Sequence, residues 1–452
     1  MSNLSPTVRG VIIFGGLVVF LVVCAFITFT VLPGAGVSVA LPVITVPGEA
    51  FNGALPSSEE YGVQNPIGGW TNTFLAMLLA DAMVIVFMLW ARRSSKNWTS
   101  QVPGRFQVFA ELIGNFIYGQ TKNFAGNRAL ALNWLFPLAA TIFVFLLAVN
   151  WMKLLPGIES VGVLHCAHEG FSGYPAIQVG PGAYQLYVDA PLDAGVRATE
   201  DDYHHCEEYK EGGVKPSKEA LAVAANELAA AEAALVAQFD AEPEVTTEEQ
   251  EVRINEARLE VIESVYEAPT FPISEEELRM GVVPYVQVVT PYVRGGSTDL
   301  NLTLGLALVS FIAIQVFGVA AQGPAYFKKF VNVDALGNAG KNPIGVIDFV
   351  VGIFEIVSEI GKIISLAFRL FGNMFAGGIL LAVMSFLIAF FLPMIFIGLE
   401  LIVTSIQAFV FAVLTIVFSA QAMEGHHGDD HDDQDHAENP EHLESHGTPA
   451  TT

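Results

Sequence analysis

Long apolar runs recur along this chain and predict several helices that cross a membrane. A run of about 20 residues, at about 1.5 Å per residue, spans a hydrocarbon core of about 30 Å. Residues 104–124 instead mix charged and apolar residues at helical spacing, which predicts an amphipathic helix at the membrane surface. The predicted spans are residues 10–32, 70–91, 133–155, 300–322, 344–392 and 396–422.

The run 344–392 is longer than one perpendicular crossing, so it predicts either a strongly tilted helix or a broken hairpin. We expect an all-α, multi-pass transmembrane protein with two long tilted helices and a large extramembrane insert between spans. The run 10–32 also resembles a signal sequence cleaved after Ala40, but its length favours a retained anchor.

The insert, residues 157–298, has a helical pattern of its own. Residues 217–241 are rich in the helix formers Ala, Leu and Glu, and 247–267 repeat apolar residues at helical spacing. These two segments predict a helical hairpin, and Ser274 with Glu277 predicts the capping box of a further short helix. The expected domains are 1–69 (an extra span and an external loop), 70–156 (two spans and the amphipathic helix), 157–298 (the acidic insert), 299–423 (the charge-bearing helices) and 424–452 (the tail).

Composition supports a membrane protein, because 52% of the 452 residues are hydrophobic. The net charge of −25 belongs to two segments. Residues 157–299 hold 27 acidic and 8 basic residues, and 424–452 hold 9 acidic and no basic residues. Such acidity argues against nucleic-acid binding, which needs Lys and Arg against phosphates. The His- and Asp-rich tail is expected to be disordered rather than a metal site.

Arg369 lies in the apolar stretch 365–383, and no acidic residue lies within nine positions of it. A charge in a bilayer costs about 3 kcal/mol or more, so it usually faces a partner, a cavity or an ion path. Nearby polar residues, three or four positions apart, would share one face of a helix. This first stripe comprises Glu355, Glu359, Lys362, Ser365, Arg369 and Asn373. A second stripe in the last span comprises Glu400, Thr404 and Gln407.

Two interpretations fit these stripes. In one, the charges pair between helices and only hold the bundle together. In the other, which the isolated arginine favours, carboxylates relay protons or ions and Arg369 is an electrostatic barrier. Asp81 is a further acid within a predicted span. A hydrogen bond to a neighbouring helix is favoured for it over a role in a channel.

The sequence SLAFRLFGNMFAG, residues 365–377, resembles the signature of subunit a of F-type ATP synthases, the membrane stator that faces a rotating ring of c subunits. Three further blocks are similar to helices of that family, in the same order: 133–157, 298–318 and 405–424. The resemblance implies a proton-conducting subunit with two half-channels, which converts proton flow into rotation and so into ATP synthesis.

The resemblance also implies roles for single residues. Arg369 would be the stator arginine, which interacts with the deprotonated carboxylate of a c subunit and prevents leakage between the half-channels. A guanidinium suits this role, since it stays charged and favours an ionised carboxylate beside it. Gln407 would face the arginine from the last helix. The residues expected to translocate protons are Arg369, Gln407, Glu400, Glu355, Asn373, Ser365 and Glu359.

The implied partners are the c-ring, the b subunits of the peripheral stalk, the other ATP synthase subunits and the lipid membrane, with no nucleic acid. No cofactor is expected. No GxxxxGK[ST] phosphate loop occurs, so we expect no nucleotide site and no active site in this chain itself. Whether the coupling ion is a proton or Na⁺ is left open, because the carboxylate that binds it lies on a partner.

Several features depart from the family pattern. Lys153 and Gly378 stand at positions that are often acidic, and no histidine occurs in any predicted span. The external half of the proton path is therefore expected to depend on Glu400 with water. The insert stands where the family usually has a short loop.

Basic residues predict the orientation, because cytoplasmic loops carry an excess of Lys and Arg. They cluster at 92–96, 105–128 and 328–341. We therefore expect a bacterial plasma-membrane protein with the insert 157–298 external, or periplasmic, and the tail cytoplasmic. An external location favours a disulfide between Cys166 and Cys206. The alternative is a zinc site, for which the available ligands are His165, His168, His204 and Cys206.

Two other functions compete with this interpretation. A secondary ion transporter would use the same buried charges, but the inverted repeats with interrupted helices that would support it are not found. A structural scaffold that displays the acidic hairpin explains the insert but not Arg369.

Overall fold

The computed structural model describes most of the membrane helices and of the insert. The predicted span 10–32 and almost all of the tail 424–452 lie outside the described residues. The described residues are 46, 48–51, 70–95, 104–155, 158–188, 192–213, 215–241, 245–330, 344–387 and 392–424.

Six helices among the described residues are long and apolar enough to cross a membrane. Five agree with predicted spans: α2 (Asn72–Ser95), α4 (Phe136–Trp151, preceded by the π-helical turn η1, Ala131–Leu135), α9 (Leu300–Gln322), α11 (Ile344–Leu387) and α12 (Leu392–Met423). The sixth, α6 (Lys218–Ala241), lies in the insert, where it packs on α7 and α8. The predicted amphipathic segment is helix α3 (Arg105–Ala125), which buries a single face.

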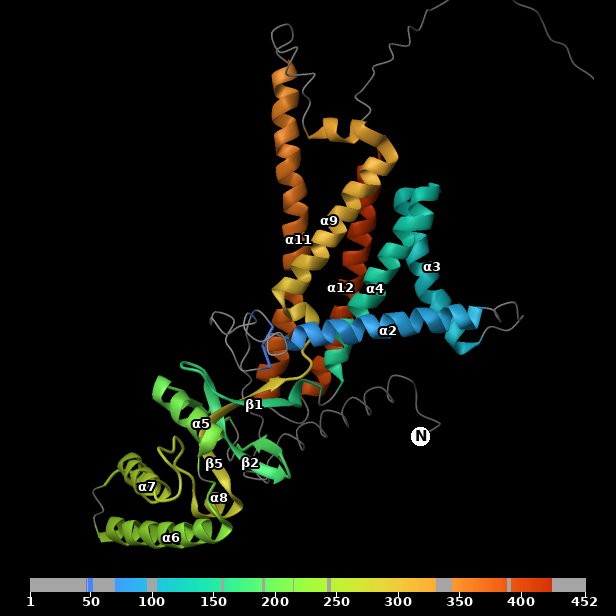
Figure 1. Ribbon diagram of the computed structural model, residues 1–452. Coiled ribbons are helices and arrows are strands. Elements are labelled where there is room, and N and C mark those ends of the chain that lie inside the picture. The colour runs from blue at the N-terminus through green and yellow to red at the C-terminus, as the bar shows by residue number, and fades with distance from the viewer. Residues whose placement is uncertain are drawn as a thin grey trace, which may run out of the picture.

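α11 is one unbroken helix of 44 residues, so the broken-hairpin alternative is wrong. No proline interrupts it, because Pro343 precedes its first residue and Pro393 is the second residue of α12. At about 1.5 Å per residue, α11 extends about 66 Å, roughly twice the hydrocarbon core. In Figure 1, α2 crosses the direction of α11 at a steep angle, so these two helices cannot both stand upright in one bilayer.

The helical bundle is built around α12, which packs against α3, α4, α9 and α11 (Figure 1). Small buried residues, among them Ala367 of α11 and Ala408 and Ala412 of α12, let the helices approach closely. Close packing of this kind holds helices together in lipid, where burial of apolar surface gives no advantage. Large apolar side chains such as Phe354 and Phe368 remain exposed on the outer face of α11.

The insert contains an antiparallel sheet that the prediction of an all-α fold missed. Its strands are β1 (Gly162–Cys166), β2 (Ser172–Gly180), β3 (Ala183–Leu186), β4 (Val196–Arg197) and β5 (Val282–Pro291). The strand order is β1-β5-β2-β3, and β4 pairs with β2. Gly162 is the register partner of Pro291, so the chain leaves and re-enters the membrane part at one place.

Helices α6, α7 and α8 of the insert agree with the sequence pattern, whereas α5 was not predicted. α6 and α7 (Thr247–Ile262) pack together as the predicted hairpin. α8 (Glu275–Met280) begins with the predicted capping box of Ser274 and Glu277. A second capping box, Thr199 with Asp202, starts α5 (Glu200–Gly212). The insert has its own hydrophobic core, separate from that of the membrane helices, and lies beyond one end of the bundle (Figure 1).

Candidate functional site

Arg369 presents its charge on the outer face of α11. Its Nη2 atom lies 3.5 Å from Oγ of Ser365, one turn earlier, and both residues are exposed. Among the described residues it forms no ion pair. The guanidinium therefore keeps its full charge in an apolar setting and is open to a partner outside this chain.

The two predicted stripes meet one turn beyond Arg369. Nδ2 of Asn373 donates a hydrogen bond of 2.8 Å to Oε1 of Gln407, which joins α11 to α12. Nε2 of Gln407 is buried and has no hydrogen-bond partner in the described part of the chain. Thr404, also buried, bonds only to the carbonyl of Leu401 in its own helix.

Lys153, one of the departures from the family pattern, turns out to be linked to Glu400. Nζ of Lys153, in the 3-10 turn η2 (Met152–Leu154), forms an ion pair with Oε1 of Glu400 in α12. Their side chains are only 2% and 6% exposed. This ion pair was not predicted from the sequence. The available signal was an unexplained lysine at the end of one span and a glutamate within another.

A small cavity opens beside this pair where the insert joins the bundle. Its volume is about 130 Å³, and its polar walls include Lys153, Glu159, Arg294 and Glu49. Arg294 lies 3.7 Å from the carboxylate of Glu49. Oε1 of Glu159 accepts a hydrogen bond of 2.9 Å from the backbone N–H of Gly295. Four charged side chains therefore gather at this cavity, and one of them, Lys153, contacts Glu400.

A second charged cluster lies toward the N-terminal end of α11. Nζ of Lys329 lies 2.7 Å from Glu355 and 3.2 Å from Glu359, and Lys362 lies 2.8 Å from Glu359. Oε2 of Glu359 also accepts a hydrogen bond of 3.3 Å from Gln315. In this cluster Glu355 and Glu359 of the first stripe form ion pairs, whereas Arg369 forms none among the described residues. Lys329 and Gln315 were missed because they lie outside the stripe on other elements.

The favoured interpretation of Asp81, a hydrogen bond to a neighbouring helix, is not supported by the structure. Its side chain is exposed, and within the described residues it forms no hydrogen bond to a neighbouring helix. It lines a largely apolar cavity of about 490 Å³ between α2 and α9, together with Phe74, Met77, Leu306 and Val309.

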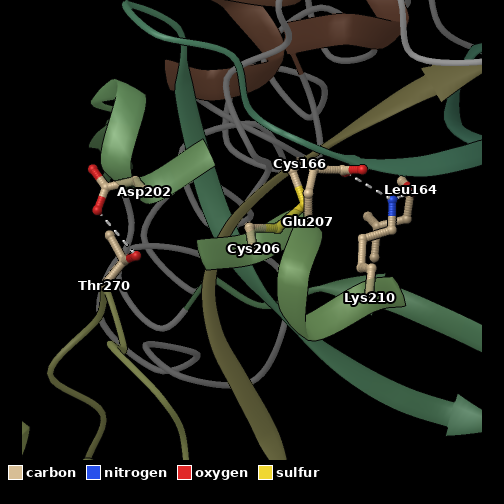
Figure 2. Close-up of a disulfide and its surroundings, with 7 residues drawn as sticks. All are labelled: Leu164, Cys166, Asp202, Cys206, Glu207, Lys210 and Thr270. Carbon is tan, nitrogen blue, oxygen red and sulfur yellow. Dashed lines mark hydrogen bonds and ion pairs between the residues drawn. A yellow bond between two sulfur atoms is a disulfide. The ribbon is translucent and has the colours of Figure 1, made fainter. Parts of the chain in front are cut away.

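Cys166 and Cys206 form a disulfide, which confirms the favoured interpretation (Figure 2). It ties β1 to α5 across a sequence separation of 40 residues. With both sulfurs bonded to each other, neither is the thiolate that a zinc site requires. Lys210 on the same helix donates to the carbonyl of Leu164, 3.3 Å away, and reinforces this junction (Figure 2).

His165, the neighbour of this disulfide, is buried in part, and its Nε2 atom has no hydrogen-bond partner among the described residues. Burial, together with the positive charge of Lys210 and the nearby His168, lowers the pKa of His165 to about 4. His168 instead stacks on Tyr203, with 4.4 Å between ring centroids.

Comparison with known proteins gives one consistent result. The sequence profile described as ATP synthase A chain matches residues 74–174 and 279–420. The chain is 36% identical over 157 residues to ATP synthase subunit a of Shewanella putrefaciens, which covers 34% of this chain and 53% of the relative. It is 35% identical to ATP synthase subunit a of Shewanella halifaxensis, covering 34% and 52%. The chain thus spans about half the length of the curated relatives it matches, and residues 175–278 lie outside the profile match.

Proposed function

Because this chain belongs to the ATP synthase A chain family, we propose that it is the membrane stator subunit that conducts protons past a ring of c subunits. Proton flow along two offset half-channels would turn the ring and drive ATP synthesis. The c-ring, the b subunits of the peripheral stalk and the other ATP synthase subunits would be its partners.

The observation that carries this proposal is the outward-facing charge of Arg369, which forms no ion pair among the described residues and lies between two polar clusters. One cluster, around Glu355 and Glu359, begins 14 residues before it in α11. The other, with Gln407 and Glu400, lies beyond it. A permanent cation between two proton-accessible regions repels a passing proton and attracts a carboxylate that arrives ionised.

The proposed orientation has two supports. Basic residues cluster at one end of the predicted spans, which marks the cytoplasmic side. The disulfide lies in the insert, and disulfides persist in oxidising compartments outside the cytoplasm. Lys153 and Glu400 would then belong to the external half-channel, and Glu355 and Glu359 to the cytoplasmic one.

The competing functions have less support. A transporter built on interrupted helices does not suit α11 and α12, which are continuous over 44 and 32 residues. A scaffold for the insert gives no reason for an unpaired arginine in an apolar helix.

The test is ATP-driven proton pumping by inverted membrane vesicles that carry Arg369→Ala in the assembled complex. We expect pumping to be lost, because the exposed cation proposed to separate the two paths is removed. Lys122→Ala, an exposed residue of α3, is the control for the loss of one positive charge. Normal pumping by Arg369→Ala with normal assembly would refute the proposal.

A further inference from the structure

Lys153 and Glu400 are more deeply buried than any other ion pair of the described residues. Removing two charges from water costs free energy that their attraction offsets only in part, so two apolar residues of similar size would serve stability as well or better. Stability alone therefore gives a poor account of the pair.

The two oxygens of Glu400 are not equivalent. Oε1 accepts from Lys153, whereas Oε2 is buried and has no hydrogen-bond partner in the described part of the chain. A buried, unbonded carboxylate oxygen is costly. It is also the atom at which an arriving proton can bind while Oε1 stays hydrogen-bonded to Lys153. Further along, Nε2 of Gln407 is buried and unbonded in the same way, as are both amide atoms of Asn150 in α4.

Two glycines make room for the pair. A methyl group on Gly377 of α11 would lie 2.9 Å from Oε1 of Glu400, and one on Gly295 would lie 2.6 Å from Cδ of Lys153. Both distances are closer than van der Waals contact. The backbones of two neighbouring segments therefore hold the carboxylate and the lysine stem in place.

The charged groups that face the pair come from three segments around the cavity. They are Glu159 from η3 (Ile158–Ser160), Arg294 before η4 (Gly296–Thr298), and Glu49. From α11 the nearby residues are Gly377 and Gly378, which carry no charge. Among the described residues, Lys153 is thus the cation in direct contact with Glu400, and it also lines the cavity.

We propose that Lys153 is a positioning residue of the external half-channel: it holds Oε1 of Glu400 in place and leaves Oε2 to take up protons that arrive by way of the cavity lined by Glu49, Glu159 and Arg294. This inference rests on the proposed function. The proton that binds Oε2 then leaves it for the carboxylate of a c subunit, which restores the ion pair between Glu400 and Lys153.

The test uses the assembled complex in vesicles, with ATP synthesis measured against the pH on the external side. Lys153→Met should lower the rate at least tenfold and change its dependence on the external pH, because Oε1 of Glu400 loses the partner that holds the proton-accepting carboxylate in place. Lys153→Arg should restore most of the rate and the original profile. Lys122→Met is the matched control.

The double variant Lys153→Met/Glu400→Gln separates this role from a structural one, since it leaves no unpaired buried charge. We expect it to assemble like the wild type and still to synthesise ATP at least tenfold more slowly. Wild-type synthesis and an unchanged pH profile would overturn the inference. Arg369→Ala in the same vesicles separates the two claims. If it abolishes synthesis, the proposed function stands even where the inference about Lys153 fails. If it does not abolish synthesis, the proposed function and the inference both fail.

Discussion

His165 in β1 is held uncharged by its surroundings, and this makes the insert sensitive to acid. Its folded pKa of about 4 lies below the ordinary value of 6.5. Between these values the unfolded chain binds more protons than the folded one, so stability is complete above pH 6.5 and falls as the pH drops toward 4. The loss amounts to at most about 3 kcal/mol.

We therefore predict that His165→Gln makes the insert less sensitive to acid. The measurement is hydrogen exchange of β1 and β5 in the full chain between pH 7 and 4.5, corrected for the intrinsic exchange rates. In the wild type, protection should fall with pH, and in the variant it should fall much less. His204→Gln, on the exposed side of α5, is the control and should behave as the wild type. Equal acid sensitivity in His165→Gln would exclude this residue as the cause.

At the level of elements, α11 and α12 are coupled by small residues as much as by polar contacts. Asn373 and Gln407 join the two helices through one hydrogen bond. One turn after Asn373, Gly377 lets Glu400 lie directly against the backbone of α11. Helices in lipid depend on such close approach, so a single added methyl group is felt.

Gly377→Ala should lower the thermal unfolding midpoint of the purified protein, with a cost of about 1–3 kcal/mol from overpacking. Gly361→Ala in the same helix is the matched comparison, because a methyl group there meets no atom within 4 Å. It should be neutral or stabilising by up to about 1 kcal/mol, since Ala favours helix over Gly. If both variants melt alike, Glu400 is not in tight contact with α11.

At the level of the whole molecule, the insert and the membrane bundle are two bodies with separate hydrophobic cores. They join through adjacent chain segments, because β1 and β5 pair from Gly162 and Pro291 onward. The charged cavity lies at this junction. The side of the membrane that holds the insert therefore decides which half-channel Lys153 and Glu400 serve.

We predict that the insert lies on the external side. Glu227→Cys, exposed on α6, should react with a membrane-impermeant maleimide in intact cells. Arg92→Cys lies near the end of α2, on the side expected to be cytoplasmic, and should react only after the membrane is permeabilised. The reverse pattern would place the insert in the cytoplasm and exchange the two proposed half-channels.

The sequence alone determined the helices and their polar faces. Apolar runs and spacings of three or four residues are local properties, so α2, α3, α9 and α12, the stripe from Glu355 to Asn373 and the α6–α7 hairpin could be predicted from them. The disulfide could be favoured because the insert that holds both cysteines is expected to be external.

Only the tertiary structure decided which distant residues meet. Lys153 and Glu400 are 247 positions apart, and no local pattern pairs them. The sheet was missed for a related reason: β1 finds its partner β5 more than a hundred residues later, and their pairing depends on long-range register. Local periodicity reports which face of an element is buried. It does not report against what that face is buried, because that depends on how the elements pack.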